Sequence, residues 1–166
     1  VGGSNVAWYK QLKAAGITSK KYNLLTISTT EDELLGIGGE NAEGFYACMK
    51  YFQSQKNPNN QAFVKAFKEM WGADSVIGDV TQAAYLGPWI WKAAVEKAGS
   101  FDIDKVHEAH PNIELPDAPE GYVRVHETNQ HLYSRAKIGK ITKDGQFEVM
   151  AVSEDLIEPD PFPKGY

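Results

Sequence analysis

Apolar residues recur at helical spacing over residues 57–72. Asn57 and Pro58 form a typical helix start, because an Asn side chain caps free N–H groups and Pro suits the first helical position. Gly72 marks the end of the pattern. The stripe comprises Phe63, Val64, Phe67, Met70 and Trp71. This spacing predicts an amphipathic helix, and we expect its aromatic residues to be buried in a core rather than to form a stacking platform.

A second helix is predicted near the start of the chain. Ser4 or Asn5 can cap it, apolar residues follow at helical spacing, and Gly16 suits the left-handed residue that ends such a helix. A short run rich in apolar and β-branched residues follows at Tyr22–Ser28, which predicts a strand. A helix followed by a strand in this way is typical of an α/β fold.

The longest predicted helix runs from Asp79 to near Gly99. Asp79 and Gln82 have the spacing of a capping box. Pro88 lies inside the helix and is expected to kink it, because proline cannot donate the intrahelical hydrogen bond. A further short helix is expected from Asp102 onward.

The segments between these helices are predicted to be loops and a strand. Residues 29–33 (TTEDE) are expected to form a polar exit from the first strand, and glycines punctuate a loop over residues 36–44. A second strand is predicted at Phe45–Phe52.

The last third of the chain has the pattern of an antiparallel β unit. Tyr122–His126 alternates weakly between apolar and polar residues, and Leu132–Thr142 is predicted to be one strand. Asp144-Gly145 is a typical hairpin signal and Phe147–Val152 is the expected return strand. The proline-rich segment 159–163 is expected to be extended.

Composition narrows the function classes. The 166 residues are 42% apolar and 23% charged, with a net charge of -5. This acidic balance argues against nucleic-acid binding, which requires a basic face, and no apolar run is long enough for membrane insertion. The single Cys48 excludes an internal disulfide framework and a cysteine-based zinc site, but it does not fix the compartment.

No catalytic pattern emerges from the motifs. The glycines from Gly36 onward do not lie between a strand and the helix it would feed, so they do not form a dinucleotide-binding fingerprint. The four histidines lack the spacing of a zinc hydrolase and are interpreted as surface or turn residues. The acidic run Glu31–Glu33 can be interpreted as paired catalytic carboxylates or, as we prefer, as the solvated first turn of a helix. Tyr85 is interpreted from its position alone as a core residue.

Several stretches, taken in order, resemble the C-terminal portion of the urea and short-chain amide-binding proteins of ABC transporters. These belong to the branched-chain amino acid and amide class of type 1 periplasmic binding proteins. The stretches that carry the resemblance are GGSNVAWYKQLKAAGI (2–17), YNLLTISTTEDE (22–33), GENAEGFYACMKYF (39–52), QAAYLGPWIWKAAVEKAG (82–99), DAPEG (117–121), DGQFEV (144–149) and PDPFP (159–163).

The resemblance implies an α/β fold of two Rossmann-like lobes joined by three crossovers, of which this chain contains only the C-terminal part. Residues 1–44 would belong to the C-terminal lobe and residues 45–116 to the N-terminal lobe. Residues 117–166 would cross back and end in the antiparallel unit and tail. The opening VGGSN, without an initiator methionine or signal peptide, further suggests a processed or truncated chain. We therefore expect an N-terminal segment of the same protein to complete the fold.

The resemblance also implies a ligand between the lobes. The residues it places on the walls of that site are Gly3, Ser4, Ser28, Thr29, Thr30 and Tyr85. Hydroxyls and backbone groups both donate and accept hydrogen bonds, and an aromatic face packs a flat ligand, so these residue types suit a small neutral amide. The resemblance implies no cofactor and no metal.

The expected function is extracytoplasmic capture of urea or a short-chain amide for delivery to an ABC permease, in the periplasm or its equivalent. An alternative is a cytoplasmic amide-sensing regulator of the same fold, which releases a regulatory partner when ligand binds. An amino-acid-binding protein ranks lower. Hydrolysis of the amide would require a nucleophile or metal that the sequence does not show.

Overall fold

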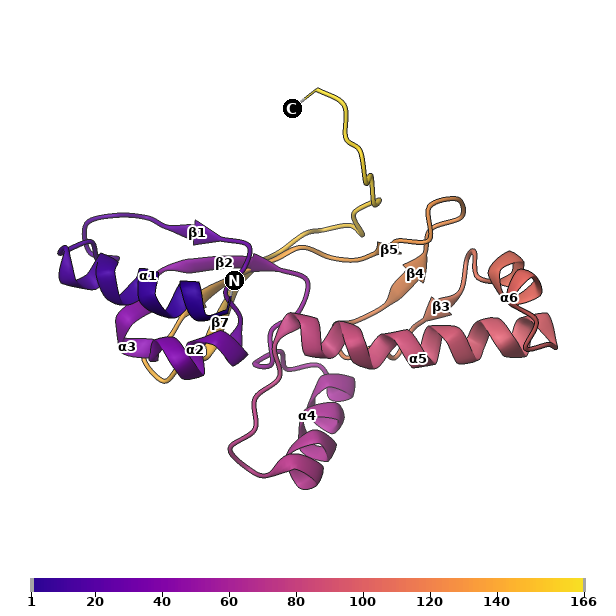
Figure 1. Ribbon diagram of the computed structural model, residues 1–166, viewed down its shortest axis with the longest axis horizontal. Coiled ribbons are helices and arrows are strands. Elements are labelled where there is room, and N and C mark those ends of the chain that lie inside the picture. Colours follow the sequence, from indigo (N-terminus) through magenta and orange to yellow (C-terminus); the bar gives the residue numbers. More distant parts are fainter. Residues whose placement is uncertain (1, 166) are drawn as a thin grey trace.

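The computed structural model describes residues 2–165 and shows an elongated molecule with a lobe at either end (Figure 1). The first lobe contains a four-stranded sheet in the order β1-β2-β6-β7. Its strands are β1 (Leu25–Thr26), β2 (Tyr46–Met49), β6 (Lys137–Ile141) and β7 (Phe147–Val152). β1 pairs parallel with β2, whereas β2, β6 and β7 pair antiparallel.

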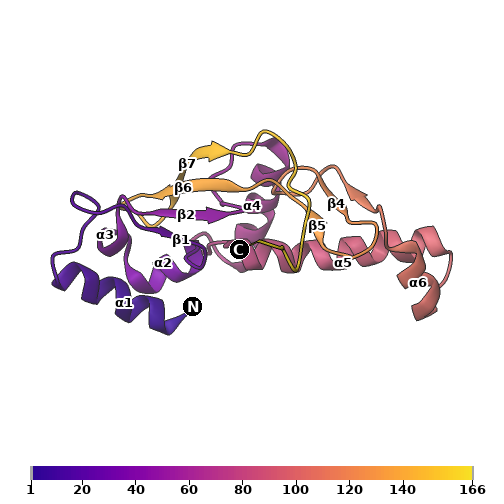
Figure 2. The ribbon, with the colours of Figure 1, turned by 90° about the horizontal axis from the view of Figure 1, so that it is seen from above.

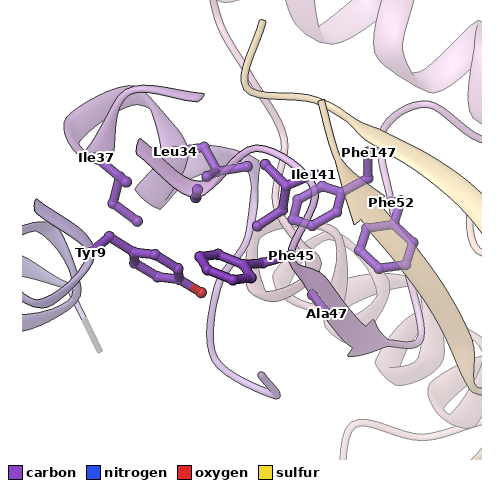
Figure 3. Close-up of a cluster of buried hydrophobic side chains, with 9 residues drawn as sticks. Tyr9, Leu34, Ile37, Phe45, Ala47, Phe52, Ile141 and Phe147 are labelled. Atoms are coloured by element: carbon purple, nitrogen blue, oxygen red, sulfur yellow. The ribbon is translucent and has the colours of Figure 1, made fainter. Parts of the chain in front are cut away.

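Three helices cover one face of this sheet, as Figure 2 shows. They are α1 (Gly3–Ala14), α2 (Glu31–Ile37) and α3 (Gly39–Ala42). Between helices and sheet lies the first core, drawn in Figure 3, whose buried residues are Tyr9, Leu34, Ile37, Ala42, Phe45, Ala47, Phe52, Ile141 and Phe147. Because these residues come from both ends of the chain, the last two strands are an integral part of the first lobe.

The second lobe packs a long helix on a small antiparallel sheet. Its elements are α5 (Asp79–Ala98), α6 (Ile103–Ala109), β3 (Glu114–Leu115), β4 (Val123–Val125) and β5 (Leu132–Tyr133), with the strands in the order β3-β4-β5. Leu86, Ile90 and Ala94 are buried at four-residue spacing along α5 and pack against Val123 and Val125. This face of α5 therefore holds the lobe together.

Helix α4 (Pro58–Trp71) lies near the junction between the lobes (Figure 1). Its buried Asn60 accepts a hydrogen bond from the Tyr51 hydroxyl at 2.8 Å and donates to the carbonyl oxygens of Gln53 and Gln55, both at 2.8 Å. The segment that leaves β2 thus fixes the first turn of α4. The chain crosses between lobes after Met49 and returns before Lys137, and the tail comes back to the junction where Ile157 pairs with Ser134.

The locally capped helices agree with the sequence-based predictions. The Asn57 side chain accepts from the N–H of Asn60 at 2.8 Å, and that of Asp102 accepts from Lys105 at 3.2 Å. Helix α5 runs continuously through Pro88 and ends at Gly99 in the left-handed conformation. The capping box predicted at the start of α5 is wrong. The N-cap residue is Gly78, which has no side chain and so makes no side-chain cap bond.

Other expectations need correction. The polar exit and glycine loop over residues 29–44 contain helices α2 and α3 instead. The strand expected at Tyr22–Ser28 is reduced to the two residues of β1. The single strand expected at Leu132–Thr142 is divided into β5 and β6, which belong to different sheets. The acidic run does form the first turn of α2, but the expectation that it is solvated is wrong for Glu31, which is only 1% exposed.

Candidate functional site

The start of α1 and the end of β1 are brought together at one edge of the first lobe. The Asn5 side-chain amide donates to the carbonyl oxygen of Ser28 at 2.9 Å and to the Glu33 carboxylate at 2.8 Å. The backbone N–H of Gly2 donates to the other Glu33 oxygen at 2.6 Å. The two segments predicted to form one wall of the site are therefore neighbours, and Glu33 joins them.

The threonines of this wall are buried. Thr29 is 1% exposed, and its hydroxyl lies 3.1 Å from the Tyr9 hydroxyl, which places it on the core side of the wall. Burial raises the pKa of the Tyr9 phenol, so that group remains a neutral hydrogen-bonding partner. Thr30 is 8% exposed and lies beside Gly78 at the start of α5. Thr29 supports the wall from within, whereas Thr30 lies at the junction with the second lobe.

Two carboxylates in the first turn of α2 bind segments that lead to the second lobe. Glu31 Oε1 accepts from the backbone N–H of Gln53 at 2.7 Å. Asp32 accepts from the backbone N–H of Gly78 at 2.9 Å and from the Thr81 hydroxyl at 3.2 Å. Burial raises the pKa of Glu31 to about 8 and also raises that of Asp32, where the bonds from Thr81 and Gly78 oppose the shift.

A second set of polar contacts at the junction involves Asp79 on α5 and Lys137 on β6. Asp79 accepts from the backbone N–H of Tyr51 and from the Lys50 ammonium, both at 2.9 Å. Lys137 is 4% exposed and donates to the carbonyl oxygens of Lys50 and Glu120. Burial lowers the pKa of Lys137 and raises that of Glu120. Sequence reasoning missed these residues, since each contact joins segments far apart in the chain.

An apolar groove of about 560 Å³ lies between α4 and α5 and is lined by Phe63, Phe67, Thr81 and Tyr85 among others. The ring centroids of Phe63 and Tyr85 are 4.5 Å apart. The prediction that the aromatic stripe of α4 and Tyr85 are core residues is wrong, because Tyr85 is 39% exposed and Trp71 is 67% exposed. Their row of rings faces the groove rather than either core.

The described residues bring the predicted wall residues into two linked groups. Gly3, Ser4, Ser28 and Thr30 belong to the first lobe, and Tyr85 belongs to the second. Thr81 connects them, because it bonds to Asp32 and lines the same groove as Tyr85. Over residues 2–165, no group of three or more His, Cys, Asp and Glu side chains is arranged to hold a metal ion. The arrangement offers hydroxyls, backbone groups and an aromatic face.

A family model described as a periplasmic binding protein domain matches residues 1–166. The chain belongs to the periplasmic binding protein family. The fold class expected from the sequence, a partial type 1 binding-protein domain of mixed α/β structure, is thereby confirmed.

Solved solute-binding proteins share the fold of this family member. One from Rhodopseudomonas palustris, in complex with 3,4-dihydroxybenzoic acid, has a TM-score of 0.82 and 21% identity, covering 95% of this chain and 44% of that one. A leucine-binding protein from Thermotoga maritima has a TM-score of 0.71 and 21% identity, covering 89% and 41%. The chain thus spans less than half the length of these relatives.

A curated relative carries an enzyme name. A limonene hydroxylase from Geobacillus stearothermophilus is 34% identical over 125 residues, which are 75% of this chain and 23% of that protein. The match covers less than a quarter of that protein, so its activity does not transfer to this binding-protein domain. None of the described helices has both the length and the apolar character needed to span a membrane.

Proposed function

We propose that this periplasmic binding protein is the solute-binding component of an ABC transporter and that it binds urea or a short-chain amide between its two lobes. The ligand would contact Gly3, Ser4, Ser28 and Thr30 on the first lobe and Tyr85 on the second, with Thr29 supporting the wall. The receiving partner would be an ABC permease, and the binding step would take place outside the cytoplasm.

The observation that carries the proposal is the absence of basic side chains from the described lining of the groove beside Tyr85. Among the described residues that line it, none is Lys or Arg, and the polar ones are hydroxyl, amide and a single carboxylate group. Two lysines at the junction, the half-buried Lys50 and the buried Lys137, are already bound to Asp79 and to backbone carbonyl oxygens. An anionic ligand would therefore lack a counter-ion here, whereas a neutral amide would not.

A partly exposed row of aromatic rings supports a further part of the proposal. Phe63, Phe67 and Trp71 on α4 continue into Tyr85 and Trp89 on α5, with neighbouring centroids 4.5 to 6.5 Å apart. Apolar patches of this kind mark binding surfaces. We propose that an N-terminal segment of a longer protein covers part of this face, in keeping with the relatives' greater length.

Calorimetric titration with urea, acetamide, leucine and benzoate tests the ligand class. We expect saturable binding of an amide, no binding of leucine or benzoate, and weaker amide binding in Tyr85→Ala. Trp91→Ala is a matched control, because Trp91 is 54% exposed on the same helix and does not line the groove. Binding of leucine or benzoate instead, or no amide binding by either this chain or the longer protein, contradicts the proposal.

A further inference from the structure

Helix α5 receives its N-terminal cap from the other lobe. Its N-cap residue is Gly78, which has no side chain to offer. Asp32 on α2 instead accepts from the backbone N–H of this N-cap residue, with Oδ1 2.9 Å from the Gly78 nitrogen, and so satisfies one of the free N–H groups at the start of the helix. A carboxylate at this position also interacts favourably with the positive end of a helix dipole. The orientation of the 20-residue α5 is thus tied to a side chain of the first lobe.

The close approach depends on glycine at position 78. A Cβ added to Gly78 would lie 2.5 Å from Asp32 Oδ2 and 2.8 Å from the Thr30 hydroxyl oxygen. The Thr30 hydroxyl has little room to withdraw, since Gly78 is buried and Thr30 is only 8% exposed. The start of α5 therefore packs directly on Thr30 and Asp32.

Asp32 also holds the first turn of α5 through a side chain. Its Oδ2 accepts from the Thr81 hydroxyl at 3.2 Å. Thr81 and Tyr85 lie one helical turn apart and line the same groove. A displacement of the α5 N-terminus would consequently move both residues relative to Thr30.

We propose that Asp32 is a positioning residue for ligand binding, which holds the N-terminus of α5 across the junction so that Thr81 and Tyr85 are fixed relative to Thr30. We call these contacts of Asp32 with Gly78 and Thr81 the interlobe latch. The expected effect of Asp32 on ligand affinity rests on the proposed function. The latch itself is measurable without any ligand.

Amide hydrogen exchange measured by NMR tests the latch. In Asp32→Ala, the Gly78 N–H loses its acceptor, and we expect exchange at Gly78 and in the first turn of α5 to accelerate about tenfold. Asp32→Asn keeps an acceptor oxygen and should restore part of the protection. Unchanged exchange at Gly78 in Asp32→Ala overturns the proposal.

Asp102→Ala is a matched control, because Asp102 caps α6 from within its own chain segment. Exchange should then accelerate in α6 and remain unchanged at Gly78. Equal acceleration at Gly78 in both variants would show a general loss of stability and would overturn the proposal.

Thr81→Val keeps the shape of the side chain and removes only one latch bond, so it serves if Asp32→Ala does not fold. We expect acetamide affinity to fall about two- to tenfold while the midpoint of guanidinium unfolding changes little. If the parent protein binds acetamide and Thr81→Val binds it with the same affinity, the positioning role of Asp32 is overturned. If the parent chain binds neither urea nor acetamide, the proposed function fails, and the exchange result alone decides whether the latch exists.

Discussion

Glu31 on α2 holds the segment that crosses to the second lobe through one hydrogen bond to the backbone of Gln53. The backbone N–H of Gln53 donates to Glu31 Oε1 at 2.7 Å, and Glu31 Oε2 is buried without a hydrogen-bond partner among residues 2–165. The ionisable groups that face this carboxyl are Asp32 beside it on α2, Asp79 on α5 and Tyr51 on the crossing segment. Burial, with the two nearby acids, raises the pKa of Glu31 to about 8. The side chain is therefore a neutral acid at neutral pH.

This pKa predicts a pH dependence of stability. The raised value means that the folded state holds the proton more tightly than the unfolded state, whose carboxyl has the ordinary pKa of 4.5. The contribution of Glu31 to the free energy of unfolding is fully present below pH 4.5. It is lost as the pH rises to about 8, at up to about 1.4 kcal/mol per pH unit. Glu31→Gln retains the neutral form, so its free energy of unfolding should fall less over that range.

Guanidinium unfolding of the parent and Glu31→Gln at pH 5, 7 and 9 measures the difference. Glu108→Gln is the control, because Glu108 is an exposed residue of α6 and its removal should leave the parent's pH profile unchanged. Parallel pH profiles for the parent and Glu31→Gln would show that Glu31 is ionised at neutral pH in the folded protein.

Asp79 is expected to stabilise the junction mainly through the backbone. Asp79→Ala leaves the Tyr51 N–H without its acceptor and should cost about 1–3 kcal/mol of unfolding free energy. Asp79→Asn keeps that acceptor and loses only the charge opposite Lys50, so its loss should be smaller. Chemical denaturation measures both. Lys92→Met removes the exposed Lys92–Glu96 pair and should cost no more than about 0.5 kcal/mol.

Equal losses in Asp79→Ala and Asp79→Asn would assign the stabilisation to the ion pair with Lys50 instead. The pair is partly shielded, with side-chain exposures of 29% for Lys50 and 14% for Asp79. Its charge therefore contributes more than that of an ordinary surface pair, but less than the buried backbone bond.

Gly139 fixes the spacing between sheet and aromatic core in the first lobe. A Cβ at this position would lie 2.7 Å from the Phe52 ring and 3.0 Å from that of Phe147, both drawn in Figure 3. Gly139→Ala should therefore destabilise the chain by about 1–3 kcal/mol through overpacking. Gly87→Ala is the opposite case, because nothing lies within 4 Å and the site is helical, so it should stabilise by about 0.5–1 kcal/mol. Thermal unfolding that ranks the two variants in the reverse order would contradict this packing argument.

The helices that sequence reasoning predicted well are those whose ends are fixed locally. Asn57 and Asp102 cap their own helices, and Gly72 and Gly99 end theirs, so the information lies within a few residues. The start of α5 is different. The sequence predicts that Asp79 caps the helix, yet its carboxylate accepts from Tyr51 and Lys50. The N–H of the actual N-cap residue, Gly78, donates to Asp32 on α2.

The candidate site was predictable only in part. The resemblance to binding proteins predicts the two wall segments, and the structure brings Asn5 and Ser28 of these segments together as neighbours. The burial of Glu31 and Lys137 could not be inferred, because Glu and Lys are ordinarily surface residues and the partners of both lie far away in the sequence. Aromatic spacing on α4 correctly predicted a stripe, but periodicity alone cannot distinguish a buried stripe from one that faces an open groove.

The C-terminal tail is held against the second lobe by Asn129. Its side-chain amide donates to the carbonyl oxygen of Pro159 at 2.8 Å, and its Oδ1 accepts from the His131 N–H at 3.0 Å. Asn129→Asp keeps the acceptor and loses the donor, so it should release the tail while leaving the local turn intact. We expect limited proteolysis to remove residues 160–165 about two- to tenfold faster from Asn129→Asp than from the parent. This factor corresponds to the free energy of the one hydrogen bond that is lost.

Asn23→Asp is the control for this change, because Asn23 is exposed and lies in the loop between α1 and β1, outside the second lobe. It introduces the same charge and should leave the cleavage rate of the tail unchanged. Glu158, 3.4 Å from His126, provides a second contact that retains the tail in part, which limits the expected acceleration. Cleavage at the parent rate in Asn129→Asp would show that the Ser134–Ile157 pairing and the Glu158 contact suffice to hold the tail.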